Sequence, residues 1–232
     1  MKKEKLKFII DNINIKGYKN FGFDDINGSC YLINTDNYNK WLQINLEINN
    51  LKNYTYLILR FKINFIIVTK ILNKALEIEY RPEYPYWWDN ADTLTMEQEL
   101  FLEINAENIR PVLKNTMTSQ DVNSFYKQIQ FIYDQYLQPF IDKYPDLQTV
   151  NNEIIEKKSS DEWCNFIPGE TIFKSLIVMK ICRNKRYTEF LDEYKSNIVN
   201  AMSNGNSRYL TYYNQLLQLA TYLESEDCKQ FL

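Results

Sequence analysis

The chain has 232 residues, enough for one generous domain or two small ones with a buried core. Its 27 Lys and Arg residues nearly balance 30 Asp and Glu residues, giving a formal net charge of −3, so a nucleic-acid partner is not expected. The chain contains no histidine, which excludes a histidine general base, Ser–His or Cys–His catalysis and any histidine-ligated metal.

The N-terminal half is predicted to open with a helix and to continue as strands. Apolar residues at helical spacing predict a helix over 4–16, which ends at Gly17. Alternation of apolar and polar residues predicts strands at 29–34, 41–48, 54–63 and 97–104. Because 49–53 is short enough for a hairpin turn, we expect antiparallel pairing. Helical spacing returns over 65–76.

The C-terminal half is predicted to be helical. A helix over 119–143 should kink or break at Pro139. Three further helices follow at 170–183, 187–202 and 207–224. The first of these three is apolar nearly all round, which predicts a central buried position.

The predicted fold class is α+β, with an antiparallel sheet and flanking helices in the N-terminal half and a helical C-terminal half. We expect a sheet subdomain over 1–105 and a helical subdomain over 106–232, one continuous domain being the alternative. No apolar run is long enough for a signal peptide or a membrane span, and the four cysteines form no C-x-x-C pair. We therefore expect a cytoplasmic protein with reduced thiols and no membrane partner.

The segment 80–90 combines two prolines with five aromatic residues, including adjacent Trp87 and Trp88. Aromatic residues in a loop either anchor it on the core, which is the commoner case, or form a recognition surface; stacking on a small ligand is a third use. The candidate partner-binding residues are Arg81, Tyr84, Tyr86, Trp87, Trp88 and Asp89.

Carboxylates are the main catalytic groups left to a chain without histidine. Glu97, Glu99 and Glu103 would share one strand face, just after Asp89 and Asp92, which could hold a divalent cation or support acid–base work. A solvated strand face produces the same pattern. We assign no catalytic residue and no metal site.

A second pattern resembles a nuclease motif, in which Pro145-Asp146 precedes Glu156-Lys157-Lys158. The interval between them reads as a helix, however, whereas that motif needs adjacent strands. No glycine-rich phosphate loop is present, so we expect no nucleotide and no cofactor.

Several short landmarks carry a resemblance to a known group of proteins. They are Phe21-Gly22-Phe23, the strands at 41–48 and 54–63, Trp87-Trp88-Asp89, and Pro139-Phe140. In this order they resemble an uncharacterised bacterial family, a domain of unknown function, over about residues 5–155. The resemblance implies a small α+β protein. Some similar proteins look like immunity proteins that neutralise toxins of neighbouring strains.

The function expected from these observations is non-enzymatic protein binding in the cytoplasm, immunity-like in character, with a toxin or a second copy of the chain as partner. The alternative is a carboxylate-dependent, metal-assisted hydrolase built on the acidic residues around 89–103. A third option is a scaffold that forms a homo-oligomer through tyrosine-rich helices such as Tyr209–Tyr222.

Overall fold

The structure is a computed structural model of the whole chain. It describes the backbone of residues 18–24, 29–34, 40–50, 55–77, 95–104, 127, 131, 134–135, 138–167, 169–203 and 209–230. It describes the side chains of residues 63, 65–77, 127, 131, 134–135, 138–167, 169–203 and 209–230.

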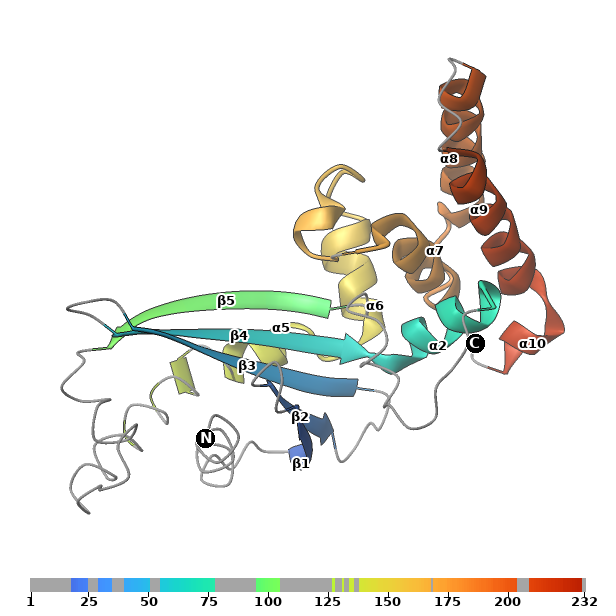
Figure 1. Cartoon of the computed structure of the whole chain (residues 1–232). Helices are drawn as coiled ribbons and strands as arrows, with labels where there is room; N and C mark the ends of the chain where they lie inside the picture. Colours follow the sequence, from blue (N-terminus) through green and yellow to red (C-terminus); the bar gives the residue numbers. More distant parts are fainter. Residues whose placement is uncertain are drawn as a thin grey trace. The chain divides into compact units, whose positions relative to one another are not determined.

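Five backbone strands follow one another across a sheet in chain order (Figure 1). They are β1 (Tyr18–Asp24), β2 (Ser29–Asn34), β3 (Lys40–Asn50), β4 (Thr55–Phe65) and β5 (Thr95–Ile104). β1 pairs antiparallel with β2, and β2 with β3, so that Cys30 lies opposite Phe23 on one side and Ile44 on the other. The register of the first pair shifts between Asn20 and Gly22.

The remaining described elements are helical. They are α2 (Ile66–Ala75), α5 (Gln138–Lys143), α6 (Leu147–Val150), the π-helical η2 (Asn151–Ile155), the 3₁₀-helical η3 (Trp163–Asn165), α7 (Thr171–Ile181), α8 (Tyr187–Ser203), α9 (Tyr209–Glu224) and α10 (Glu226–Lys229). The predictions of helices at 65–76, 170–183, 187–202 and 207–224 are thus confirmed.

Pro139 lies in α5, which is described over Gln138–Lys143. Residues 136 and 137 lie outside the described residues, so the predicted kink or break at Pro139 stays a prediction. Most of 119–137 and the predicted helix at 4–16 lie outside the described residues.

Helix α7 is the centre of the packed helices. It contacts α2, α6, η2, α8 and α9, and its residues from Phe173 to Met179 are all buried, including Lys174 at 0% exposure. Burial on every side explains why the segment is apolar nearly all round, as the sequence predicted. Ile71 of α2 and Leu216 and Leu219 of α9 are completely buried, and both helices contact α7.

The predicted fold class needs correction. Of the residues whose side chains the structure describes, 76% are helical, so the core that they form is built mainly from helices and not from an antiparallel sheet with flanking helices. Helix α2 lies in the N-terminal half of the sequence and packs on α7 and α9, which lie in the C-terminal half. Alternation in the sequence reports local backbone conformation and does not report which surfaces pack together, and this is why the prediction was wrong.

Contacts divide the chain into two compact units, each made of two segments. Unit 1 combines Met1–Asn64 with Met96–Pro145, and unit 2 combines Phe65–Thr95 with Asp146–Leu232. The division into subdomains 1–105 and 106–232 stays a prediction. In the part of the chain that the structure describes, no helix is both long enough and apolar enough to cross a membrane.

Candidate functional site: the outer face of the α8–α9 hairpin

Helices α8 and α9 of unit 2 lie side by side as a hairpin (Figure 1). Each has an apolar face that is buried, through Phe190, Leu191 and Ile198 in α8, and Leu216, Leu219 and Leu223 in α9. Spacings of three, four and seven residues in α9, and of seven and eight residues between Ile198 and the other two residues in α8, place each set on one side of its helix. The buried faces explain why the two helices pack together and on α7.

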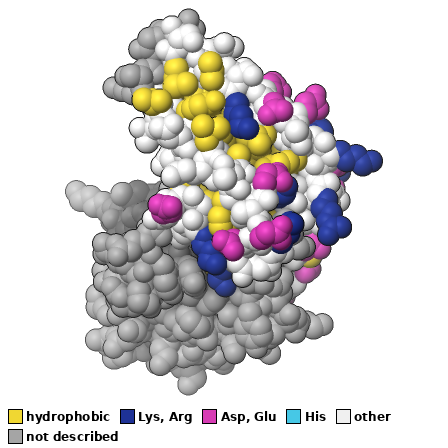
Figure 2. Space-filling view, turned by 90° about the vertical axis from the view of Figure 1, so that its right-hand side faces the viewer, with side chains coloured by type: hydrophobic (Ala, Val, Ile, Leu, Met, Phe, Trp, Pro, Cys, Tyr) yellow, Lys and Arg dark blue, Asp and Glu magenta, His cyan; other side chains and the backbone are white. Residues whose placement is uncertain are grey.

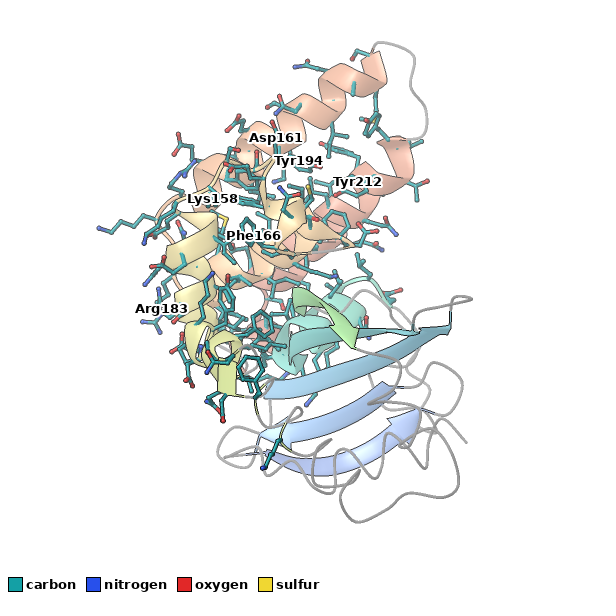
Figure 3. All side chains as sticks on the ribbon, turned by 90° about the vertical axis from the view of Figure 1, so that its left-hand side faces the viewer. Lys158, Asp161, Phe166, Arg183, Tyr194 and Tyr212 are labelled. Carbon is teal, nitrogen blue, oxygen red and sulfur yellow. The ribbon has the colours of Figure 1, made fainter. Side chains whose placement is uncertain are left out.

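A chain of aromatic rings stabilises the inner side of the hairpin. The Phe190 ring of α8 lies 4.9 Å from the Trp163 ring and 6.1 Å from the Tyr194 ring. The Tyr194 ring in turn meets the Tyr212 ring of α9 edge-on at 6.3 Å, and Tyr212 stacks on Phe173 at 4.6 Å. Figure 3 shows Tyr194 and Tyr212 directed toward each other between the two helices. Ring pairs at these separations are favourable beyond the area they bury.

Burial also controls the ionisation of Tyr212. Its removal from water raises the pKa of the hydroxyl well above the usual value for tyrosine, and the neighbouring Tyr194 hydroxyl adds to this effect. Tyr212 is therefore neutral at physiological pH, which suits a packing role.

The hairpin also carries apolar residues that are partly exposed. Val199, Tyr209, Leu210 and Leu217 are between 37% and 55% exposed. In α9, Leu210 and Leu217 are seven residues apart and so lie on one face, which is distinct from the buried face of Leu216 and Leu219. Figure 2 shows hydrophobic side chains gathered near the end of the hairpin, away from most of the charged side chains on that view. We call these four residues the outer apolar face.

Charged residues are almost absent from this part of the sequence. The 28 residues from 196 to 223 contain one charged residue, Arg208, although 25% of the whole chain is charged. A segment that has few charged residues and is rich in tyrosine, methionine and leucine is typical of the core of a protein–protein interface. The tyrosine-rich segment Tyr209–Tyr222 was noted in the sequence, and this charge gap is the further signal that would have located Val199, Leu210 and Leu217.

The aromatic segment predicted to bind a partner lies outside the described residues. It contains Arg81, Tyr84, Tyr86, Trp87, Trp88 and Asp89, and Asp92 lies outside the described residues as well. Glu97, Glu99 and Glu103 fall on β5, where only the backbone is described. A partner-binding role for the aromatic segment and a metal-binding or catalytic role for these acids stay predictions.

The residues of the nuclease-like pattern have structural roles. The interval between Asp146 and Glu156 is helical, as predicted, and consists of α6 and η2. Asp146 caps α6, because its carboxylate accepts hydrogen bonds from the Thr149 N–H at 2.7 Å and from the Thr149 hydroxyl at 2.9 Å. Lys157 pairs with Glu153 at 2.7 Å. In the part of unit 2 with described side chains, this pattern does not form the paired strands that a nuclease site requires.

The described side chains offer little else for catalysis. No group of three or more Asp, Glu, Cys or His side chains that could hold a metal ion occurs among them. Cys164, Cys182 and Cys228 are free thiols. Burial raises the pKa of the Cys182 thiol to about 11, and the carboxylates of Asp146 and Glu156 add to the shift, so this thiol is a poor nucleophile near neutral pH.

Comparison with known proteins adds no relationship, since no family model, curated protein or solved structure matches this chain.

Proposed function

We propose that this chain is a non-enzymatic, cytoplasmic protein-binding protein, that the outer apolar face of α8 and α9 is its binding surface, and that a second copy of the chain is the partner. The observation that carries the proposal is the exposed apolar face within a 28-residue stretch that has one charged residue. The free thiols of Cys164, Cys182 and Cys228 are consistent with a reducing compartment.

The face supports binding because burying it would be favourable. When exposed leucine and tyrosine side chains are buried in an interface, they contribute about 25 cal/mol of favourable free energy for each Å² of apolar area removed from water. Two such leucines on one helix, at a spacing of seven residues, form a stripe of the kind that packs against another helix. A single exposed leucine would need no explanation, but a grouped set does.

The lack of charge supports a second copy over a strongly charged partner. A toxin with a basic surface would be attracted by carboxylates, and residues 196–223 contain none. An uncharged apolar face is complementary to itself, and two copies related by a twofold axis would bring two hairpins together as four helices. An immunity-like role with a toxin as partner is the competing outcome of the test below.

The test is the mass of the full chain in solution, measured by sedimentation equilibrium. We expect a species of twice 27.9 kDa that dissociates on dilution. The double variant Leu210→Glu/Leu217→Glu would place two carboxylates in each half of the interface. We therefore expect this variant to be monomeric up to about 100 µM, which corresponds to a loss of several kcal/mol of association free energy.

The chain offers a matched control. Thr211 and Gln218 are also exposed, also seven residues apart, and lie on the polar side of α9. The variant Thr211→Glu/Gln218→Glu therefore adds the same charge at the same spacing and should remain dimeric. Thermal melts would verify that both variants fold. If the wild-type chain is monomeric at about 100 µM, a second copy is rejected as the partner. That result would favour a different protein, such as a toxin, as the partner. Equal dissociation of both variants would reject the outer apolar face as the surface.

A further inference from the structure

A cavity of about 510 Å³ lies where α7 ends and α8 begins, at the start of the α8–α9 hairpin. Its volume is in the range of small-molecule sites. The residues that line it come from α7, from the connection to α8, from the first turn of α8 and from α10. They are Met179, Lys180, Arg183, Asn184, Tyr187, Thr188 and Lys229.

The lining is cationic. Three of its seven residues are Lys or Arg, and none is acidic. The surrounding stretch 171–188 contains five Lys and Arg residues and no Asp or Glu, in a chain whose net charge is −3. Lys180 pairs with Glu224 at 2.6 Å, and Lys229 pairs with Glu226. Among the described residues, Arg183 has no ion pair, so its guanidinium is the cation most available to a ligand.

The backbone at Arg183 adopts a conformation that favours glycine. Its φ is 52°, in the left-handed region, directly after α7. Its N–H donates to the Lys180 carbonyl at 3.1 Å, and the next N–H, of Asn184, donates to the Met179 carbonyl at 2.8 Å. A long cationic side chain at a position where glycine would be more stable points to a use for that side chain.

The connection that holds Arg183 is itself fixed by hydrogen bonds. The Asn184 amide donates to the Asn151 side-chain oxygen at 2.7 Å, and its own side-chain oxygen accepts from the Arg186 N–H at 2.9 Å. Asn151 is 1% exposed, so the anchor for this connection lies inside unit 2. A site is effective when the residues that carry it are held in place in this way.

The first turn of α8 contributes the second favourable element. Tyr187 and Thr188 are the first two residues of this 17-residue helix and both line the cavity. N–H groups in a first turn have no carbonyl partner within the helix, and the helix dipole makes this end positive. The Tyr187 N–H donates to the Asn184 carbonyl at 3.1 Å and the Phe190 N–H to the Arg186 carbonyl at 2.9 Å, so the Thr188 N–H is the donor of this turn nearest to the cavity lining. Lys180 covers the Tyr187 ring with its ammonium group 5.0 Å from the ring centre, which places its charge beside the same turn. Figure 3 shows Arg183 well apart from Tyr194 and Tyr212, so this cavity is distinct from the aromatic interior of the hairpin.

We propose that this cavity binds the phosphate group of a small molecule, with Arg183 as the principal cation. A phosphate dianion has oxygens in several directions and can meet a guanidinium, ammonium groups from α7 and α10 and the Thr188 hydroxyl together. A carboxylate has fewer oxygens and half the charge, so it would use this set of donors less well. Binding is non-covalent and leaves the outer apolar face of the hairpin unoccupied.

The test is isothermal titration of the full chain with inorganic phosphate and, separately, with glycerol 3-phosphate, at constant ionic strength set with sodium chloride. We expect a dissociation constant below about 1 mM for at least one of the two. Tighter binding of the ester would show that the cavity takes an organic phosphate, and tighter binding of the free ion would identify inorganic phosphate as the ligand.

Two variants that remove one positive charge each make the test specific. Arg183→Gly deletes the guanidinium but suits the left-handed backbone, so it should fold at least as stably as the wild type while binding phosphate at least about tenfold more weakly. Lys185→Gln removes an exposed cation two residues away that does not line the cavity, and it should bind as the wild type does. Absence of binding by the wild type, or equal binding by the wild type and Arg183→Gly, would overturn the proposal.

Discussion

At the scale of single residues, two helices in unit 2 are each followed by a residue that has a positive φ and is not glycine. Glu77, which follows α2, has a φ of 53°, and Arg183, which follows α7, has a φ of 52°. Glycine is the usual residue at such positions, because any side chain with a Cβ atom is disfavoured in the left-handed region. The chain has only five glycines, and neither position received one.

Replacement of Glu77 by glycine should therefore stabilise the protein. We expect Glu77→Gly to raise the free energy of unfolding by about 0.5–1 kcal/mol, since relief of the unfavourable backbone conformation outweighs the added freedom of the unfolded chain. Urea denaturation followed by circular dichroism would measure it. Glu77→Gln, which keeps the Cβ atom and removes the charge, serves as the control and should change stability little. A loss of stability in the glycine variant would show that the side chain, not the backbone, decides this position.

At the scale of elements, α9 carries two apolar faces with different roles. Leu216 and Leu219 are completely buried, whereas Leu217 is 37% exposed and Leu210 is 55% exposed. The sequence alone shows leucine at all four positions and does not separate the faces. Neighbouring helices make the distinction, because α9 rests on α2, α7, α8 and α10 with one side only.

The neighbouring pair Leu217 and Leu219 tests this assignment. Leu219→Ala should lower the free energy of unfolding by about 2–5 kcal/mol, because it leaves a cavity in the core. Leu217→Ala should lower it by less than about 1 kcal/mol when unfolding is measured at a concentration where the chain is monomeric. Chemical denaturation of both variants in parallel would check this. Similar losses for both leucines would mean that the outer apolar face is part of the core.

At the scale of the whole molecule, several buried groups resist ionisation at alkaline pH. Burial raises the pKa of the Cys182 thiol from 9.0 to about 11, and burial also raises the pKa of the hydroxyls of Tyr187 and Tyr212. The Tyr187 hydroxyl has no hydrogen-bond partner among the described residues, and the nearby Glu224 carboxylate further opposes its ionisation. In the unfolded chain all three groups would have the pKa values that are usual for exposed cysteine and tyrosine side chains.

Stability should therefore fall as the pH rises above about 9. Between about 9 and 11 the unfolded chain has released the Cys182 proton and the folded chain has retained it, so the unfolded state binds fewer protons and the free energy of unfolding decreases with pH. Urea midpoints measured from pH 7 to 11 would show the decline. The urea midpoint of the Cys182→Ala variant should decline less steeply over the same pH range. A flat profile up to pH 11 would contradict the burial of these groups.

The sequence could predict those elements that depend on neighbours along the chain. The sequence predicts four helices to within a few residues of their bounds, and it predicts the helical interval after Asp146 that rules out paired strands. Hydrophobic periodicity acts within a few residues, so it can be read without the fold. The buried centre of α7 was predictable for the same reason, because a helix apolar on every side has no face for water.

Contacts between distant segments decided the rest. The tertiary structure joins α2 to α7, which begins at Thr171, and to α9, which begins at Tyr209, and these long-range contacts are why the predicted fold class failed. It buries Lys174 within an otherwise apolar helix, exposes one leucine face of α9 and brings Lys229 of α10 to the cavity beside Arg183. Local sequence determined which segments are helical, and only packing determined which of their faces meet each other, because burial depends on the position of every neighbouring element.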